Sequence, residues 1–419
     1  MVIKEGYKQT EIGLIPNEWE VKNIGDVCQI FGRIGFRGYT VNDIVKKEQG
    51  AITISPSNIY GDKINFAKCT YISWFKYHES PEIKIYNGDV LLVKTGSTSG
   101  KTALVKNLNE KATINPQLVV LKKILINNFL LSYIMSYDIV QNQIISTIVG
   151  GAIPTLSQKQ VLSFKIPLAP SLAEQSAIAN ALSDADGLIT GLEKLITKKR
   201  NIKQGAMQQL LQPKDGWEVK KLGEVGKCIR GVSYNPERDL HSHDKNNTSR
   251  LLRSNNIKNR NLDFNNLQFV NIDRVKTHQF LQKGDIVICM ANGSKQLVGK
   301  SAIFNIKDNI KYTFGAFMGC FRTDKKIASS SFIAVNFQTF QYRCYIDVLL
   351  SGSSINNLNP SNIESIEIPF PPIAEQTRIA SILSDMDAEL SVLVQKLEKY
   401  KKVKLGMMQE LLTGKTRLV

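Results

Sequence analysis

The chain has 419 residues, of which 42% are hydrophobic, so it is long enough for two or more domains with packed cores and too apolar to be disordered. No apolar run approaches the ~18 residues of a membrane span, and the N-terminus has no apolar signal segment, so no membrane partner is expected. The six cysteines form no Cys-x-x-Cys pair, which predicts reduced thiols and a cytoplasmic protein. The net charge is +17, with 24 Lys and Arg against 17 Asp and Glu up to residue 212 and 30 against 20 after it; two basic halves favour two contact surfaces for a polyanion such as DNA, and a solvated lysine-rich surface is the alternative.

The first 170 residues are predicted to form a mixed domain. Trp19-Glu20-Val21-Lys22 opens it, and the tryptophan is expected to anchor the domain. Short apolar runs at residues 51–54, 90–93 and 118–121 predict strands, and residues 128–145 have the spacing of a helix. Short strands followed by a helical segment indicate an α+β fold.

A glycine-rich turn, VKTGSTSGKT, occupies residues 93–102. It resembles a phosphate-binding P-loop, but Thr95 replaces the first glycine and no helical pattern follows. We therefore predict a strand–turn–strand hairpin, whose polar tip could touch DNA. The side chains expected to do so are Lys94, Ser97, Thr98 and Lys101.

Residues 171–212 are predicted to form a long helix. Ser171-Leu172-Ala173-Glu174 has the pattern of a capping box. Apolar residues then recur with a seven-residue step, which gives the helix one apolar seam. The seam residues are Ile178, Leu182, Ile189, Leu192 and Ile196. About 40 residues of helix span ~60 Å, and such a helix needs a partner to bury its seam.

The rest of the chain repeats these features in the same order. Trp217-Glu218-Val219-Lys220 opens a second domain over residues 213–371, and a second helix and tail are predicted over residues 372–419. Its seam consists of Ile379, Leu383, Leu390, Leu393 and Leu397. The sequence similarity of the two copies nearly disappears where residues 61–86 align with residues 260–282, as expected of one scaffold with two different recognition surfaces.

The two helices are predicted to pair with each other. The first helix leads from one domain to the next, so the second most simply runs back along it as an antiparallel coiled coil. The C-terminus would then lie near the first domain and the N-terminal arm. The predicted fold class is therefore α+β: two similar mixed α/β globular domains separated by two long antiparallel coiled-coil helices, with an internal pseudo-two-fold repeat. An ordinary core helix is the alternative.

Further candidates for DNA contact lie in polar, glycine-bearing segments and in repeated turns. Arginine is the commonest reader of guanine edges, although any single arginine among these is more often a surface ion-pair residue. Outside the first hairpin the candidates are Arg33, Arg37, Asn58, Arg230, Arg253 and Asn256, with Asn292, Ser294, Lys295 and Lys300 in the second hairpin.

No catalytic or metal site is predicted. His241-Ser242-His243-Asp244 contains metal-ligand residue types, but the first copy lacks them, so a solvated loop is expected. The Asn-Pro-Pro-aromatic motif of adenine methylation is not found either.

Over essentially its whole length the chain resembles the specificity (S) subunits of type I restriction–modification enzymes. The resemblance rests on the duplication, the Trp-Glu-Val-Lys openings, the Gly-Lys-[Thr/Ser]-Ala turns at Gly100 and Gly299, and the Ala-Glu-Gln helix starts at Ala173 and Ala374. It implies two target-recognition domains that each read one half of a bipartite target in double-stranded DNA. It implies that the helices set the gap between the halves and dock two modification (methyltransferase) subunits, which two restriction (translocase/nuclease) subunits join.

By the same resemblance this chain is a non-catalytic subunit with no cofactor of its own. S-adenosylmethionine, ATP and Mg²⁺ are expected on the partner subunits. Two other functions stay open: a P-loop NTPase that uses Gly100-Lys101-Thr102, and a structural adaptor that joins proteins through its helices without reading DNA.

Overall fold

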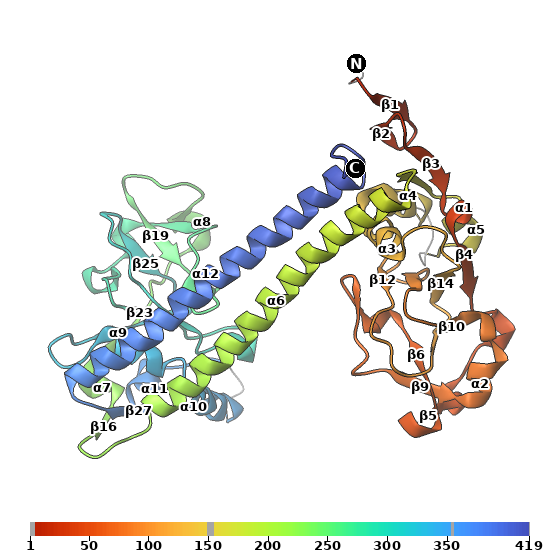
Figure 1. Cartoon of the computed structure of the whole chain (residues 1–419). Helices are drawn as coiled ribbons and strands as arrows, with labels where there is room; N and C mark the ends of the chain where they lie inside the picture. Colours follow the sequence, from red (N-terminus) through yellow and green to blue (C-terminus); the bar gives the residue numbers. More distant parts are fainter. Residues whose placement is uncertain (1–4, 149–154, 353–355, 419) are drawn as a thin grey trace. The chain divides into compact units, whose positions relative to one another are not determined.

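The computed structural model describes residues 5–148, 155–352 and 356–418 and divides into two compact units (Figure 1). Unit 1 combines Met1–Glu193 with Gln395–Val419, and unit 2 is Lys194–Val394. Each unit therefore contains one mixed domain and part of each long helix, α6 (Leu172–Leu210) and α12 (Ile373–Leu411). The predicted α+β class with two long helices is confirmed.

Two sheets form the domain of unit 1. One is antiparallel, and the other is mixed because β13 and β6 pair in parallel. The antiparallel sheet has the order β12 (Thr102–Leu104), β11 (Val90–Val93), β14 (Leu118–Lys122), β4 (Gln29–Gly32). The mixed sheet has the order β10 (Lys84–Ile85), β13 (Ala112–Ile114), β6 (Gly50–Ile54), β9 (Thr70–Ser73), β5 (Ile44–Val45).

Strand β11 separates two cores, because alternate residues of a strand face opposite sides of the sheet. Leu91 and Val93 lie in the core shared with the mixed sheet. Val90 and Leu92 lie in a second core, which includes residues of both long helices. The short pairs of unit 1 are β1 (Tyr7–Thr10) with β2 (Gly13–Pro16), β3 (Glu20–Asn23) with β15 (Lys165–Leu168), and β7 (Ile59–Tyr60) with β8 (Lys63–Ile64). Its shorter helices are α1 (Ile24–Val27), α2 (Trp74–Glu79), α3 (Asn128–Ser136), α4 (Asp138–Ile148) and α5 (Gln158–Leu162).

Unit 2 repeats this plan, including the parallel pair, here β19 with β25. One sheet has the order β17 (Gly226–Arg230), β26 (Met318–Thr323), β23 (Ile286–Cys289), β24 (Ser301–Ile303). The other has the order β18 (Leu240–His241), β22 (Gln268–Asn271), β19 (Thr248–Leu252), β25 (Tyr312–Phe314). The short pairs are β16 (Glu218–Lys221) with β27 (Glu367–Phe370) and β20 (Ile257–Lys258) with β21 (Asn261–Leu262). The shorter helices are α7 (Leu222–Val225), α8 (Pro236–Asp239), α9 (Ser330–Asn336), α10 (Phe340–Ser351) and α11 (Pro360–Glu364).

Within each unit the two long helices run antiparallel. In unit 1 Lys404 of α12 pairs with Asp186 of α6 at 2.6 Å, and in unit 2 Lys203 of α6 pairs with Asp387 of α12 at 2.5 Å. The two ion pairs are equivalent in the repeat, since each lysine and each aspartate recurs 201 positions later. Of the seam residues, Ile178, Leu182, Ile189, Ile196, Ile379, Leu383 and Leu397 are buried, and Leu192, Leu390 and Leu393 are half-buried.

The start of α6 is joined to the end of the chain. The Ser171 hydroxyl accepts the Glu174 N–H at 3.1 Å, as the capping pattern predicts. The Glu174 carboxylate pairs with the Arg417 guanidinium, a partner that the sequence did not predict. The Tyr7 hydroxyl donates to the Lys415 carbonyl at 3.1 Å. The C-terminal tail therefore meets the N-terminal arm within unit 1, as expected from antiparallel helices.

Candidate nucleic-acid interface

Four connections between strands lie together at one end of the sheets in unit 1, and we call them the loop end of domain one. They are residues 33–39 after β4, 55–58 after β6, 94–101 between β11 and β12, and 115–117 between β13 and β14. Hydrogen bonds join them. The Asn115 N–H donates to the Ile54 carbonyl at 2.8 Å and the Lys94 N–H to the Gln117 carbonyl at 2.8 Å. The Asn115 side-chain amide donates to the Tyr39 hydroxyl at 2.9 Å.

Unit 2 has an equivalent loop end of domain two. It consists of residues 231–235 after β17, 253–256 after β19, 290–300 between β23 and β24, and 315–317 between β25 and β26. The Gly315 N–H donates to the Leu252 carbonyl at 3.0 Å, and the Met290 N–H to the Phe317 carbonyl at 2.9 Å. The repeated sequence thus builds the same frame of loops twice and places different side chains on it.

The glycine-rich turns are hairpins. Strand β11 pairs with β12 on either side of the first turn, and β23 pairs with β24 on either side of the second. Gly100 (φ +94°) and Gly299 (φ +83°) occupy the left-handed region that favours glycine. Because Lys101 leads into a strand where a P-loop requires a helix, the predicted hairpin is confirmed and the NTPase interpretation has no structural support.

Most predicted hairpin side chains are accessible at the loop ends. In domain one Ser97 and Lys101 are exposed, and Lys94 and Thr98 are half-buried. The second hairpin exposes Ser294 and Lys295 and half-buries Asn292 and Lys300.

Two of these second-hairpin side chains already have partners. Asn292 donates to the Ser254 hydroxyl at 3.3 Å, and the Lys300 ammonium donates to the Ile257 carbonyl at 3.3 Å. Met290 is the structural counterpart of Lys94, because their backbone carbonyls make matching hydrogen bonds. The Lys94 carbonyl accepts the Leu156 N–H and the Met290 carbonyl accepts the Leu358 N–H, both at 2.8 Å. The two hairpins therefore present different chemistry at equivalent backbone positions.

Arg33, one of the predicted DNA contacts, is a brace inside the loop end. The residue is 5% exposed, and its guanidinium donates to the carbonyls of Arg37 (3.1 Å) and Ile114 (3.4 Å). It also lies over the Tyr39 ring, 5.5 Å from the centroid. Burial lowers the pKa of this guanidinium below its usual value.

Asn58 and Asn256, which are also among the predicted DNA contacts, close turns. They are 5% and 1% exposed. Their side-chain oxygens accept the N–H groups of Ser55 and Arg253, each at 2.9 Å, and their amides donate to the carbonyls of residues 68 and 263. An asparagine that bonds nearby backbone is a turn former. Their repetition therefore reflects a shared turn.

The remaining predicted arginines differ in accessibility. Arg37 is half-buried and lies 3.6 Å from the Glu82 carboxylate. Arg230 is exposed, and its guanidinium donates to the Asn359 side-chain oxygen at 2.6 Å. Arg253 is half-buried, and its Nε is buried with no hydrogen-bond partner among the residues described.

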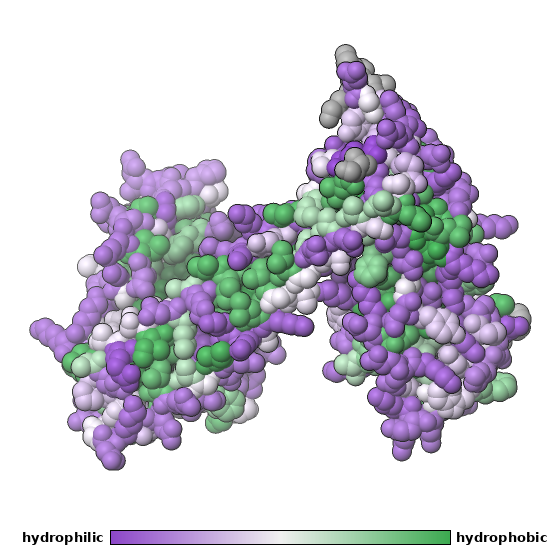
Figure 2. Space-filling model, in the orientation of Figure 1, coloured by the Kyte–Doolittle hydropathy of each residue, from purple (hydrophilic) through white to green (hydrophobic). Residues whose placement is uncertain are grey.

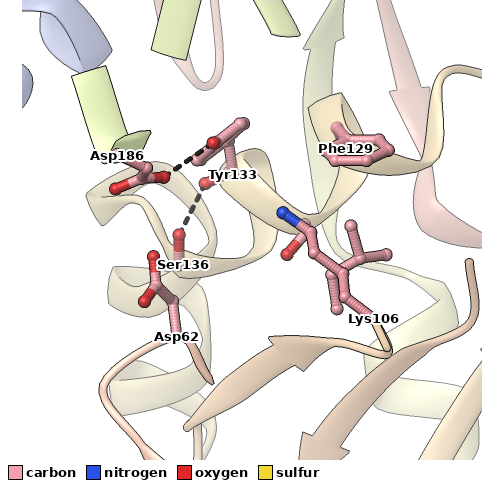
Figure 3. Close-up of a pocket in the computed structure, with 8 residues that line it drawn as sticks. Asp62, Lys106, Phe129, Tyr133, Ser136 and Asp186 are labelled. Carbon is pink, nitrogen blue, oxygen red and sulfur yellow. Dashed lines mark hydrogen bonds between the residues drawn. The ribbon is translucent and has the colours of Figure 1, made fainter. Parts of the chain in front are cut away.

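A small pocket in unit 1 joins one turn of the domain to the helices (Figure 3). The Tyr133 hydroxyl points at Asp186 and donates to it at 2.7 Å. Lys404 lies 2.6 Å from Asp186 and 3.2 Å from Asp62, which sits in the β7–β8 turn. Burial first, and then the bond to Asp186, raise the pKa of the Tyr133 hydroxyl. The cavity, about 20 Å³, has room for only about one water, which is too small for a ligand, so we interpret this site as a structural junction.

No cluster of His, Cys, Asp or Glu suited to a metal occurs in the part of the chain that the structure describes. His241 bonds to Asn271 at 2.7 Å, and Asp244 pairs with Arg250 at 2.9 Å. Across the same residues, no helix combines the length and apolar character that crossing a membrane requires.

The long helices also expose apolar side chains outside their seams. Several are visible as green areas along the helices in Figure 2. Those more than a third exposed are Leu172, Leu188, Leu195 and Ile202 on α6 and Ile373, Val392, Val394, Val403 and Leu405 on α12. Exposed apolar side chains gathered on one element are typical of a protein-binding surface.

Comparison with known proteins identifies relatives of one kind. The type I restriction enzyme EcoKI specificity subunit of Escherichia coli (strain K12) is 36% identical over 200 residues, which are 48% of this chain and 42% of that subunit. The match thus spans about two fifths of that relative. The type I restriction enzyme MjaVIII specificity subunit of Methanocaldococcus jannaschii is 26% identical over 99% of this chain and 97% of its own.

Among solved structures, the type I restriction-modification system S subunit from M. genitalium shares the fold. The TM-score is 0.59 with 15% identity, over 98% of both chains. The family model "Type I restriction modification DNA specificity domain" matches residues 16–204 and 214–402, which together are most of the sequence. Because that model matches both copies of the repeat, each with its loop end and its long helix, the chain belongs to the type I restriction–modification DNA specificity family.

Proposed function

We propose that this chain is the DNA sequence-specificity subunit of a type I restriction–modification complex. Each loop end reads one half of a bipartite target. The antiparallel helices set the gap between the halves and dock two methyltransferase subunits, to which two restriction subunits are added. The chain itself is non-catalytic, and S-adenosylmethionine, ATP and Mg²⁺ act on the partner subunits.

The observation that carries this proposal is the duplicated loop frame with different side chains. The same backbone hydrogen bonds hold residues 94 and 117 together in domain one and residues 290 and 317 together in domain two. A frame built twice favours two readers of one kind of ligand, and the changed side chains favour two different sequences. The net charge of +17 suits a polyanion.

The helices supply the support for protein partners. Their exposed apolar side chains, such as Leu188 and Val392, have more than half of their surface in solvent. Burying such surface against another protein is favourable at ~25 cal/mol per Å².

The direct test is to express the chain with its cognate methyltransferase subunit and to map methylated adenines in the host DNA. We expect a split motif with one methylated adenine on each strand. Methylation without a sequence motif, or dependence on a single unsplit motif, would contradict the proposal. A structural adaptor predicts that the methylation pattern does not depend on this chain.

The proposal that the helices set the gap between the two halves of the target has its own test. Lys199 of α6 and Glu389 of α12 lie 2.6 Å apart in unit 2, so they mark one level of the helix pair. Inserting seven residues into both helices at this level keeps the seams in phase and adds about 10 Å. That length corresponds to about three base pairs. We expect methylation at the original gap to be lost and any new motif to have a longer gap. Full methylation of motifs with the original gap would refute the proposal that the helices set this gap.

A further inference from the structure

Gln117 and Phe317 occupy the same place in the two loop ends. Each carbonyl accepts an N–H from the start of the hairpin, Lys94 in one copy (2.8 Å) and Met290 in the other (2.9 Å). The residue two positions earlier, Asn115 or Gly315, donates to the carbonyl of the neighbouring parallel strand. The next residue closes the turn in both copies, Leu118 to Asn115 at 3.0 Å and Met318 to Gly315 at 2.8 Å.

This position is held rigidly. Besides Met290, the Ala291 N–H also donates to the Phe317 carbonyl at 3.0 Å. Met318, the next residue, is 1% exposed. A Cβ at Gly231 would lie only 2.0 Å from the Gly315 carbonyl oxygen, so the chains approach more closely there than a side chain permits. In domain one the Asn115 side-chain oxygen accepts the Gln117 N–H at 2.7 Å.

Both side chains nevertheless point outward. Phe317 is 71% exposed, and Gln117 is exposed as well. A phenylalanine that is mostly exposed contributes little apolar burial to the stability of the fold. An exposed aromatic side chain on a rigid support is typical of a contact residue.

The chemistry of the two side chains matches different bases. A glutamine amide donates and accepts at once, which suits the N6 and N7 atoms of adenine in the major groove. A phenylalanine ring has no hydrogen-bonding group and suits the C5-methyl group of thymine. The frame is common to both domains, so a difference at this one position changes what is read without changing how the loop is held.

We propose that residues 117 and 317 are equivalent specificity positions: Gln117 reads an adenine in one half of the target, and Phe317 contacts a thymine methyl in the other. This inference rests on the proposed function, because it requires that the loop ends face DNA. It assigns the discrimination at one base pair of each half to a single side chain.

The test maps methylation motifs for the full chain expressed with its methyltransferase subunit. Phe317→Ala should relax one A·T position in one half of the motif, with about a tenfold loss of discrimination there. Gln117→Ala should relax one position in the other half only. Matched controls are Phe340→Ala, which removes a phenylalanine that is 73% exposed on α10, and Gln49→Ala, just before β6; both should leave the motif unchanged.

A chemical probe tests the thymine contact without mutation. Deoxyuridine lacks the C5-methyl group, so its placement at the assigned position should slow methylation by the wild-type complex about tenfold and leave the Phe317→Ala complex unaffected. Phe317→Leu keeps an apolar contact and should retain preference for thymine. If DNA methylated by the wild-type complex shows no split motif, the proposed function is refuted. An intact wild-type motif that neither variant changes, or changes by both variants in the same half, would refute this inference alone.

Discussion

Arg417→Ala tests whether the C-terminal tail is fixed by a buried carboxylate. Glu174, at the start of α6, has a side chain that is 1% exposed, and Arg417 binds it through Nε and, at 2.9 Å, through Nη2. Removing one partner of a buried ion pair costs about 3–5 kcal/mol. The shortened side chain would admit water to the carboxylate, so we expect a loss of about 2–3 kcal/mol in the free energy of unfolding.

Urea denaturation of the wild type, Arg417→Ala, Glu174→Gln and the double variant measures this effect. Glu174→Gln should destabilise the wild type and stabilise the Arg417→Ala chain, because only in the latter does it remove an uncompensated buried charge. Arg378→Ala is the matched control. It removes an arginine, 52% exposed, that pairs with the repeat-equivalent Glu375, and it should destabilise the chain much less than Arg417→Ala does, because exposed ion pairs contribute little to stability. Equal destabilisation by Glu174→Gln in both backgrounds would refute the reasoning.

Three further substitutions probe the helices and hairpins, each followed by urea denaturation. Leu182→Ala, at a seam residue with no exposed surface, should cost about 2–5 kcal/mol, whereas Leu188→Ala, at a side chain 54% exposed, should change stability by less than about 0.5 kcal/mol; equal effects would argue against a buried seam. Gly299→Ala should cost about 1–3 kcal/mol because of its φ of +83°, while Gly293→Ala, with open space around it, should be nearly neutral. Lys404→Ala leaves two carboxylates without their shared cation and should cost about 1–2 kcal/mol; an unchanged midpoint would show that the pocket junction contributes nothing.

The helices were the most predictable part of the molecule, because their seven-residue step is a local property of the sequence. Both were expected within two residues of their observed starts, where Ser171 and Pro372 mark the first turn. The sheets were less predictable. The parallel pairing of β6 with β13 joins segments about 60 residues apart, and nothing in either segment specifies the other.

The candidate interface was predictable in position and less so in its residues. Asn58 closes a turn and Arg33 braces a loop, yet in sequence each has the same residue type as a base-reading side chain. Burial separates the two roles, and burial depends on long-range packing. Gln117 and Phe317, to which we assign base contacts only by proposal, were not predicted from the sequence because their neighbours share no motif. Aligning Ile114-Asn115-Pro116-Gln117-Leu118 with Phe314-Gly315-Ala316-Phe317-Met318 by hydrophobic pattern would have shown that the two positions are equivalent.

The two ion pairs between the long helices, Lys203 with Asp387 and Lys404 with Asp186, have a consequence for how genes of this kind can change. Each copy of the repeat carries one lysine and one aspartate, and each pair takes its lysine from one copy and its aspartate from the other. A chain assembled from two copies that each keep this lysine and this aspartate would therefore contain both pairs. Recombination could then replace the segment that follows Trp19 or Trp217 and leave the helix contacts intact. The two ion pairs between the helices would need no compensating mutations after such an exchange.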